Sequence, residues 1–180
     1  FDRLYGINAM AGNQKVSEKT PPIAAENSDF DLVQRLWMAT QEMALSLDEE
    51  DFGSFLGYCA NDLFSRIPAF SNEIRKPVTF LDLDRSGLQV LTETIDRHIR
   101  FPNKLIRHPG RPMITNVDGD RVSCTTKVAI FHVDLHGVSA LFVVANYRDV
   151  FAMSEAGPRL MEREVAMETR SLPFGCHLPL

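Results

Sequence analysis

Alternating apolar and polar residues between positions 107 and 151 predict three consecutive antiparallel strands. The first is a short run that ends at Asp118-Gly119, a two-residue hairpin signal whose turn positions both favour positive φ. The chain is expected to reverse again near Leu135-His136-Gly137. The predicted strands span residues 114–117, 121–133 and 138–151.

The long strand at 121–133 changes character along its length. At its outer end apolar and polar residues alternate, and one face carries Val122, Cys124, Thr126, Val128 and Ile130. Toward the second turn, residues 128–133 and 138–145 are apolar on both faces. An antiparallel sheet with one solvated face does not show this pattern, so the second face is expected to be covered. This surplus of apolar positions is the first indication of a partner subunit.

Three segments have apolar residues at helical spacing. The first spans residues 28–46, the second is shorter, and the third carries apolar residues as far as Ile99. Residues whose side chains can accept hydrogen bonds from free backbone amides stand where each helix would begin. The expected N-caps are Ser28 or Asp29, Asp48 or Asp51, and Asp82 or Asp84.

The apolar positions of these segments also predict the core. The stripe of the first helix consists of Phe30, Val33, Trp37, Thr40 and Ala44, widened by Leu32, Leu36, Ala39 and Met43. The aromatic side chains expected in the core are Trp37, Phe52, Phe55, Phe64 and Phe142.

Two further strands and a short extended segment complete the expected sheet. Residues 63–70 have a strand pattern, and Pro68 within them indicates an edge position, because proline cannot donate a ladder hydrogen bond. Residues 160–170 alternate as a strand with an acidic outer face, although their Met, Glu and Ala content keeps a helix open as the alternative. Extended structure is also expected at 79–83.

This order of elements predicts an α+β fold, with helices on one side of a bent antiparallel sheet. Residues 28–180 are expected to form one domain. Residues 1–27 contain two glycines, a charged patch and a Pro-Pro pair, and they are expected to form an extended arm. Two alternatives stay open for this arm: disorder, or a path across a neighbouring subunit.

Composition and charge exclude several functional classes. The 180 residues are 44% apolar, and a net charge of -5 with a pI of about 5.5 argues against nucleic-acid binding. No apolar run approaches the roughly 20 residues of a membrane helix, and no signal peptide is recognised. The cysteines, Cys59, Cys124 and Cys176, form no CxxC or CxH pair. We therefore expect a reduced, cytoplasmic protein without a metal cluster.

Local patterns spread over most of the chain carry a family resemblance. They are Leu47-Asp48, Asp51-Phe52, Phe55-Leu56, Cys59-Ala60-Asn61-Asp62, Phe64, Pro68, Arg107-His108, Ile114-Thr115-Asn116-Val117, Tyr147-Arg148-Asp149 and Arg163. Together they resemble the small (β) subunit of Rieske non-haem iron oxygenases of the ring-hydroxylating type. The resemblance covers residues 28–180, and it departs from the family pattern at the long connection 71–84 and the short link 152–159.

The resemblance implies a cystatin-like cone, in which three helices pack in the concave face of a strongly curved antiparallel sheet. It also implies a structural, non-catalytic subunit that forms a trimer and joins a large α subunit in an α3β3 hexamer. The 2Fe-2S Rieske cluster and the mononuclear iron would lie in the α subunit, and ferredoxin and reductase would act through it. This chain would then hold no cofactor. The substrate stays open among aromatic acids, hydrocarbons and small sulfonates, as does mono- versus dioxygenation.

One close set of metal-ligand residue types occurs in the sequence: His132, Asp134 and His136. Strand alternation would place all three on one face, but His136 falls at the expected turn, which breaks that geometry. The paired CxH and CxxH motifs of a Rieske cluster are absent from the sequence. Both observations favour an interpretation in which this chain binds no iron.

Two interpretations of the remaining polar residues stay open. In the first they make contacts within or between subunits, since Arg and Tyr are enriched in interfaces. Its candidate interface residues are Arg107, His108, Tyr147, Arg148, Phe131 and Val133. In the second the chain is a free-standing cone-fold enzyme of the isomerase, dehydratase or cyclase kind with an acid/base site. The residues that could converge there are Asp62, His108, Tyr147 and Asp149. The apolar second face favours the first interpretation.

Overall fold

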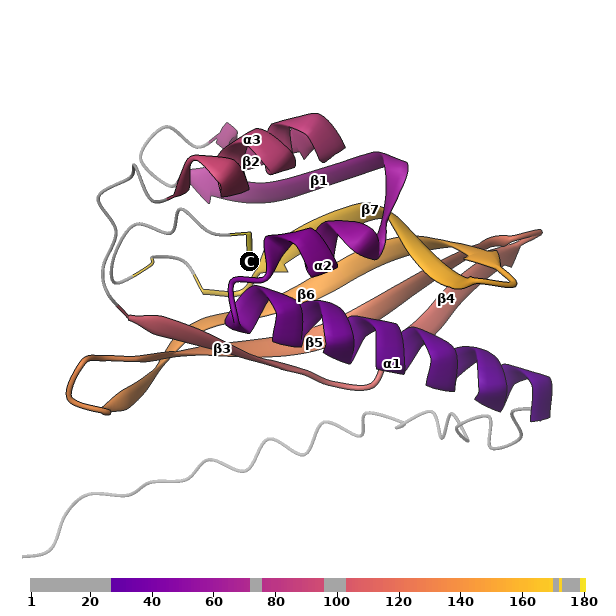
Figure 1. Cartoon of the computed structure of the whole chain (residues 1–180), viewed down its shortest axis with the longest axis horizontal. Coiled ribbons are helices and arrows are strands. Elements are labelled where there is room, and N and C mark those ends of the chain that lie inside the picture. Colours follow the sequence, from indigo (N-terminus) through magenta and orange to yellow (C-terminus); the bar gives the residue numbers. More distant parts are fainter. Residues whose placement is uncertain (1–26, 72–75, 96–102, 170–171, 173–178) are drawn as a thin grey trace, which may run out of the picture.

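The computed structural model describes residues 27–71, 76–95, 103–169, 172 and 179–180. Its elements are α1 (Asn27–Asp48), α2 (Phe52–Gly57), β1 (Cys59–Ser71), β2 (Lys76–Asp84), α3 (Arg85–Glu93), β3 (Lys104–Pro109), β4 (Met113–Asp118), β5 (Arg121–Val133), β6 (Ser139–Ser154) and β7 (Gly157–Met167). All three helices lie on one side of a twisted sheet (Figure 1), and α3 packs on β1 and β2. The α+β class is confirmed.

The seven strands form one mixed sheet in the order β2-β1-β7-β6-β5-β3, and β4 also pairs with β5. The expectation of a purely antiparallel sheet is wrong, because β1 and β7 run parallel, with Phe64 opposite Glu162. These two strands are far apart in sequence and are not joined by a hairpin, so nothing forces them to be antiparallel. The sheet twists but is not strongly curled, so the expected strong curvature is not seen.

The two hairpins that the sequence predicts between 114 and 151 are confirmed. In the first, Asp118 pairs with Arg121, so the turn residues are Gly119 and Asp120, one position later than expected. Gly119 has a φ of 59°, as the first position of a type II′ turn requires. In the second, the carboxylate of Asp134 accepts hydrogen bonds from the backbone amides of His136 at 2.8 Å and Val138 at 2.9 Å.

Two strands differ from the expectation. β1 lies between β2 and β7, but its pairing with β7 ends at Arg66. Pro68 pairs with Thr79 of β2 alone, beside a register shift, so β1 is not an edge strand although the proline stands where only one side of the strand is paired. The apolar pattern of the sequence does not predict strand β3. Its buried positions are Leu105, Arg107 and Pro109, and a buried arginine and proline hide the apolar alternation. The final strand, β7, is confirmed over its helical alternative.

The helices begin close to where the sequence places them. Asp51 caps α2 by accepting a hydrogen bond from the Ser54 amide at 3.0 Å, and Asp84 caps α3 by accepting one from the Gly87 amide at 2.8 Å. Helix α3 ends at Glu93 with Thr94 as its C-cap, earlier than expected. Ile95 is buried as predicted, and residues 96–99 of the expected helix lie outside the described residues. No helix in the described ranges is long and apolar enough to cross a membrane.

The core expectation is confirmed in part. Phe55 and Phe142 are buried, and Phe52 packs against the core. Trp37 and Phe64 are 39% and 40% exposed, so their predicted core positions are wrong. The buried side of α1 consists of Leu36, Ala39, Thr40, Met43, Ala44 and Leu47, so the true apolar stripe is rotated away from Phe30 and Trp37. Bulky aromatic side chains therefore remain on the surface of the isolated chain.

Candidate functional site

Five polar side chains meet in the interior between the end of α1 and the sheet, and we call them the polar cluster. They are Asp48, Arg107, Tyr147, Asp149 and Arg163. Asp48 is the last residue of α1, and the others stand at inward-facing positions of β3, β6 and β7. Two arginines and two aspartates balance their charges within this group.

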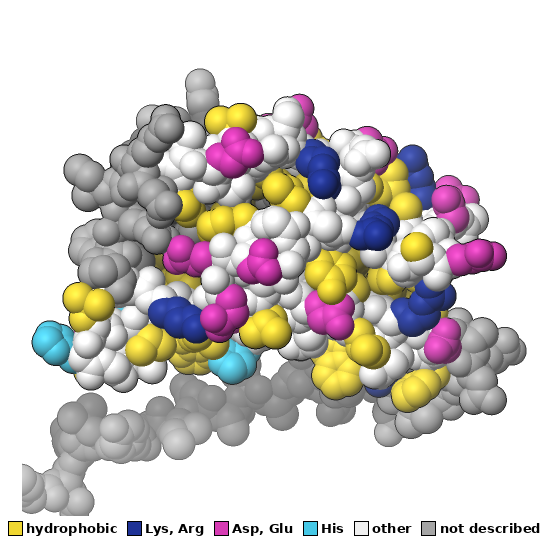
Figure 2. All heavy atoms as spheres, viewed as in Figure 1, with side chains coloured by type: hydrophobic (Ala, Val, Ile, Leu, Met, Phe, Trp, Pro, Cys, Tyr) yellow, Lys and Arg dark blue, Asp and Glu magenta, His cyan; other side chains and the backbone are white. Residues whose placement is uncertain are grey.

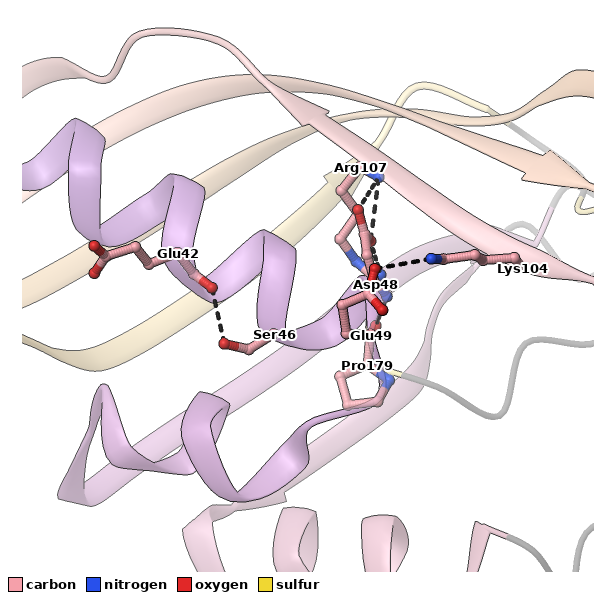
Figure 3. Close-up of polar contacts among 7 residues, drawn as sticks. All are labelled: Glu42, Ser46, Asp48, Glu49, Lys104, Arg107 and Pro179. Carbon is pink, nitrogen blue, oxygen red and sulfur yellow. Dashed lines mark hydrogen bonds and ion pairs between the residues drawn. The ribbon is translucent and has the colours of Figure 1, made fainter.

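Arg107 joins three parts of the chain (Figure 3). The Asp48 carboxylate accepts hydrogen bonds from the Arg107 backbone amide at 3.0 Å and from its Nη1 at 2.6 Å. Nη2 donates to the carbonyl oxygen of Pro179 at 2.5 Å. The side chains of Arg107 and Asp48 are almost inaccessible to solvent, so this is a buried ion pair that fixes the end of α1 to β3.

Asp149 and Arg163 form the second ion pair of the cluster. The carboxylate accepts from Arg163 Nε at 2.9 Å and from Nη2 at 2.8 Å, a two-bond geometry across neighbouring strands. Burial opposes the positive charge of Arg163, but the Asp149 carboxylate holds its pKa above the usual range. The guanidinium also lies 4.2 Å from the centre of the Tyr147 ring, a cation–π contact.

Tyr147 is fully buried, yet its hydroxyl has no hydrogen-bond partner within the described part of the chain. Burial raises the pKa of this phenol, because the phenolate would lose its hydration. The tyrosine is therefore a neutral group at physiological pH. Its ring packs in the apolar interior while its oxygen is unsatisfied.

Tyr147→Phe is expected to keep or raise stability. The hydroxyl makes no protein hydrogen bond among the described residues, and a buried unsatisfied polar group costs about 1–3 kcal/mol. Urea denaturation should show an unchanged or higher free energy of unfolding. Tyr147→Ala is the contrasting variant, since loss of the ring should cost about 3–5 kcal/mol. A loss of more than about 1 kcal/mol in Tyr147→Phe would show that the hydroxyl has a structural partner.

The other predicted site residues lie on or near the surface. His108 is exposed, and its ring meets Phe131 edge-on with centres 5.5 Å apart. Arg148 is exposed and pairs with Glu164 at 2.5 Å. Val133 is half-buried beside the second hairpin. Of the six interface candidates, only Arg107 and Tyr147 therefore belong to the polar cluster.

The structure does not bring the alternative acid/base set together. Asp62 is exposed on β1 and lines a surface hollow of about 290 Å³ with Arg85. His108 lies on β3, and β7, β6 and β5 separate that strand from β1. Only Tyr147, with Asp149 near it, is in the interior.

Asp48, Asp149 and Arg163 are polar-cluster members whose roles sequence reasoning missed. The signal that could have found Arg163 is its place in the alternation of β7, where Val165 is the next buried residue. A charged residue at an inward-facing strand position requires a buried partner. Asp149 occupies the corresponding position of β6.

The described residues contain no group of three His, Cys, Asp or Glu side chains arranged to hold a metal ion. His132, Asp134 and His136 do not form such a group. The Asp134 carboxylate instead accepts hydrogen bonds within the hairpin turn. The iron and the Rieske cluster of the implied family therefore find no fitting ligand set in this part of the chain.

The buried thiols of Cys59 and Cys124 should make stability depend on pH. Burial raises their pKa values to about 11 and about 12, respectively, whereas the pKa of a thiol in the unfolded chain is about 8.5. The contribution of these thiols to the free energy of unfolding is fully present below the pKa of the unfolded thiol. It is lost as pH rises above that pKa, because the thiols of the unfolded chain then ionise while the buried thiols stay neutral. Above pH ~9, each of the two thiols should lower the free energy of unfolding by up to about 1.4 kcal/mol for every pH unit.

Urea denaturation between pH 8 and pH 10 measures this slope, with Cys176→Ser as the background. The control is Cys59→Ala with Cys124→Ala, which should flatten the profile. An equally steep fall in that double variant would assign the effect to other groups.

A patch of apolar side chains is exposed at the β5–β6 hairpin, and we call it the hairpin patch. Its members are Leu135, Val138, Leu141 and Val144, with exposed fractions of 76%, 61%, 52% and 39%. Phe131 pairs directly with Leu141, so the predicted interface residue Phe131 adjoins the patch. Val138, Leu141 and Val144 belong to the run that is apolar on both faces in the sequence, and a partner that covers them stays a prediction.

Comparison with known proteins gives relatives along most of the chain. The β subunit of 2-aminobenzenesulfonate 2,3-dioxygenase from Alcaligenes sp. is 35% identical over 134 residues, covering 74% of this chain and 89% of that one. The β subunit of the methanesulfonate monooxygenase hydroxylase from Methylosulfonomonas methylovora is 29% identical over 154 residues, covering 79% and 83%. No family model matches the sequence.

Solved structures show the same fold at low identity. A chain of naphthalene 1,2-dioxygenase with indole bound superposes with a TM-score of 0.68 at 15% identity, covering 84% of this chain and 85% of that one. A scytalone dehydratase-like protein from Novosphingobium aromaticivorans has a TM-score of 0.58 at 13% identity, covering 84% and 95%. The fold is thus shared between oxygenase subunits and dehydratase-like proteins.

Fold and interior together define a small α+β protein of the cone-like class, with a charge-balanced polar cluster and exposed apolar surface. Within that class, the chain belongs to the β subunits of aromatic-ring-hydroxylating (Rieske) oxygenases. Partnership with an oxygenase α subunit follows from this membership.

Proposed function

We propose that this chain is a structural, non-catalytic subunit that holds catalytic α subunits in an α3β3 hexamer around a trimer of its own kind. The hairpin patch carries the proposal, because it places four exposed apolar side chains at one end of the sheet. Exposed apolar patches of this kind mark protein interfaces. Obligate interfaces bury roughly 2,000 Å² or more, so we expect surface beyond the patch to take part.

The polar cluster supports a structural role in a different way. Each arginine in it has its own aspartate, and both ion pairs are internal to the chain. The residues that would supply acid/base chemistry to a free-standing enzyme, Asp62 and His108, lie at the surface. Buried polar atoms without a hydrogen-bond partner among the described residues favour such an enzyme as the second candidate; they are the Tyr147 hydroxyl, Thr126 Oγ1 and Arg107 Nε.

In this proposal the 2Fe-2S cluster and the mononuclear iron belong to the α subunit. Ferredoxin and reductase reach this chain only through that subunit, and the complex works in the cytoplasm. The role of this chain is then to set the positions of three α subunits around one axis. Its own residues touch neither metal nor substrate.

We further infer a sulfonate as the substrate class of the assembled enzyme. Support comes from the two relatives, which are named for 2-aminobenzenesulfonate and methanesulfonate. Oxygen uptake by the purified complex should respond to these two compounds and not to benzoate. The opposite response would reassign the substrate without changing the role of this chain.

Co-expression with the α subunit tests the structural role. Sedimentation velocity should give a hexamer in which iron follows the α subunit, while the chain purified alone should be colourless and free of stoichiometric iron. Iron near one equivalent in this chain alone, removable by His132→Ala, would contradict the proposal. The proposal would also be contradicted if this chain stayed monomeric at micromolar concentration and did not bind the α subunit.

Turnover per iron in size-selected hexamer separates the two candidate functions. For a scaffold, Tyr147→Phe and His108→Ala should leave that turnover near the wild-type value. If either residue transferred a proton in a pocket of this chain, turnover should fall by about 10²–10⁴. Such a fall in turnover, with the hexamer intact, would show that this chain is catalytic and not only structural.

A further inference from the structure

Large apolar side chains lie on the side of α1 that is turned away from the sheet, and we call this side the α1 face. Its members are Phe30, Trp37, Met38 and Leu45, each at least 39% exposed. The helix places the uncharged Gln34 and Gln41 between them. Figure 2 shows apolar side chains gathered over α1. At about 1.5 Å per residue the α1 face is roughly 22 Å long, which suits a protein partner rather than a small molecule.

A surface hollow of about 540 Å³ adjoins the α1 face, and we call it the basic hollow. It lies between α1, α2 and the turn that joins β6 to β7, and Met38 belongs to both the hollow and the α1 face. The charged residues that line the hollow are Arg35, Glu42 and Arg159. The lining is therefore positive on balance, although the whole chain has a net charge of -5.

Backbone carbonyls hold the two arginines of the basic hollow in place. Arg35 Nη2 donates to the carbonyl oxygen of Ser154 at 2.9 Å, and Arg159 Nη1 donates to that of Gly57. Neither arginine forms an ion pair with a carboxylate in the described part of the chain. A carbonyl oxygen is neutral, so these bonds position the guanidinium groups without neutralising them. Groups that are already positioned lose less conformational entropy when a partner binds.

Glu42, the acid of the basic hollow, has a neutral partner of its own. The Tyr58 hydroxyl donates to Glu42 Oε2 at 2.6 Å, and this hydrogen bond raises the pKa of the tyrosine. Tyr58 therefore keeps its proton and continues to bind the Glu42 carboxylate. The charges of Arg35 and Arg159 are thus available to a carboxylate from another chain.

The basic hollow and the hairpin patch lie at opposite ends of the molecule (Figure 1). The hairpin patch is at the start of β6 and the hollow is at its end. β6 has 16 residues, which span roughly 50 Å at about 3.3 Å per residue. A trimer joined through the hairpin patch would leave the far end of β6 pointing away from the trimer axis, where an α subunit can reach it.

We propose that the basic hollow and the α1 face bind the α subunit, through a segment that places a carboxylate against Arg35 and Arg159 and an apolar side chain against Met38. The inference rests on the proposed function, from which it takes the α subunit as the partner, and it adds the surface and the chemistry of the contact. The apolar α1 face supplies buried area, and the two arginines select an acidic segment.

Arg35→Glu tests the inference in the complex co-expressed with the α subunit. Mass photometry of the diluted complex measures how much α subunit stays bound. The variant places like charges face to face, so it should weaken α-subunit binding by on the order of 10²-fold. The variant chain purified alone should self-associate as the wild type does, because the basic hollow is away from the hairpin patch.

Two control variants separate the local charge from other effects. Arg35→Lys keeps the charge and should bind the α subunit within about threefold of the wild type. Lys127→Glu changes the net charge by the same amount as Arg35→Glu. Lys127 is exposed on the sheet face opposite to the helices, so this variant should bind the α subunit as the wild type does.

The outcomes distinguish failure of this inference from failure of the proposed function. Equal α-subunit binding by Arg35→Glu and the wild type would overturn the inference alone. Loss of self-association in Arg35→Glu would also overturn it, because the hollow would then hold a second copy of this chain. A wild-type chain that binds no α subunit would contradict the proposed function, and the inference with it.

Should Arg35→Glu not fold, Met38→Asp replaces it, since the Met38 side chain is 53% exposed and a charge there is tolerated by the single chain. Met38→Asp should weaken α-subunit binding at least about tenfold, because it removes an apolar contact and adds a charge that repels the partner's carboxylate. Unchanged binding in this variant would overturn the inference.

Discussion

Asp149→Ala is expected to lower the free energy of unfolding by about 3–5 kcal/mol, because it leaves the buried guanidinium of Arg163 without its partner. Both side chains are almost completely buried, so solvent cannot replace the lost carboxylate. The unfolding midpoint in urea, measured with an unchanged slope, gives this number. Asp149→Leu combined with Arg163→Met removes both charges, and it should recover much of the loss.

The neighbouring residue pair provides the matched control. Arg148 and Glu164 join the same two strands one position away, but Arg148 is largely exposed. Arg148→Ala should therefore cost at most about 1 kcal/mol, the range of surface ion pairs. Equal losses in Asp149→Ala and Arg148→Ala would show that burial does not decide the strength of the inner pair.

Leu141→Glu is expected to abolish the hexamer while leaving the fold intact. Leu141 is more than half exposed in the single chain, so a charge there should hardly affect its own stability. In the assembly we propose, the same charge would be buried against a neighbour. A loss of about 2 kcal/mol or more, the size of an interface hot spot, weakens association at least about thirtyfold.

Val90→Glu on α3 is the control, since Val90 is similarly exposed, at 59%, and lies away from the hairpin patch. Sedimentation velocity of the co-expressed subunits should show hexamer for Val90→Glu and smaller species for Leu141→Glu. Thermal unfolding should give similar midpoints for the two isolated chains. Intact hexamer in Leu141→Glu would place the interface elsewhere.

The sequence predicts the elements that follow local rules. Helix starts were found because Asp51 and Asp84 are caps, and the two hairpins because Gly119 and Gly137 take the positive φ that the turns require. The sequence does not predict β3, because the charged residue Arg107 occupies one of its buried positions and interrupts the alternation of apolar and polar residues. The parallel contact of β1 with β7 is a long-range pairing that no local pattern encodes.

The interior site was predicted only in part, for a related reason. Arg107 and Tyr147 were named, but burial of a charge depends on a partner that lies far away in the sequence. Asp48 is 59 positions from Arg107, and its role in α1 could be foreseen only as a cap. The exposed Trp37 shows the opposite failure: an aromatic residue predicted in the core lies on the surface of the single chain.

The pairing of β1 with β7 has a consequence for how the protein is made. β1 is synthesised about a hundred residues before β7, and contacts of such long range slow folding. Until β7 has left the ribosome, one edge of β1 has no strand beside it, and an open edge of this kind invites association with other chains. The sheet therefore closes only when its last strand has been translated, and the nascent chain is most vulnerable to aggregation just before that moment.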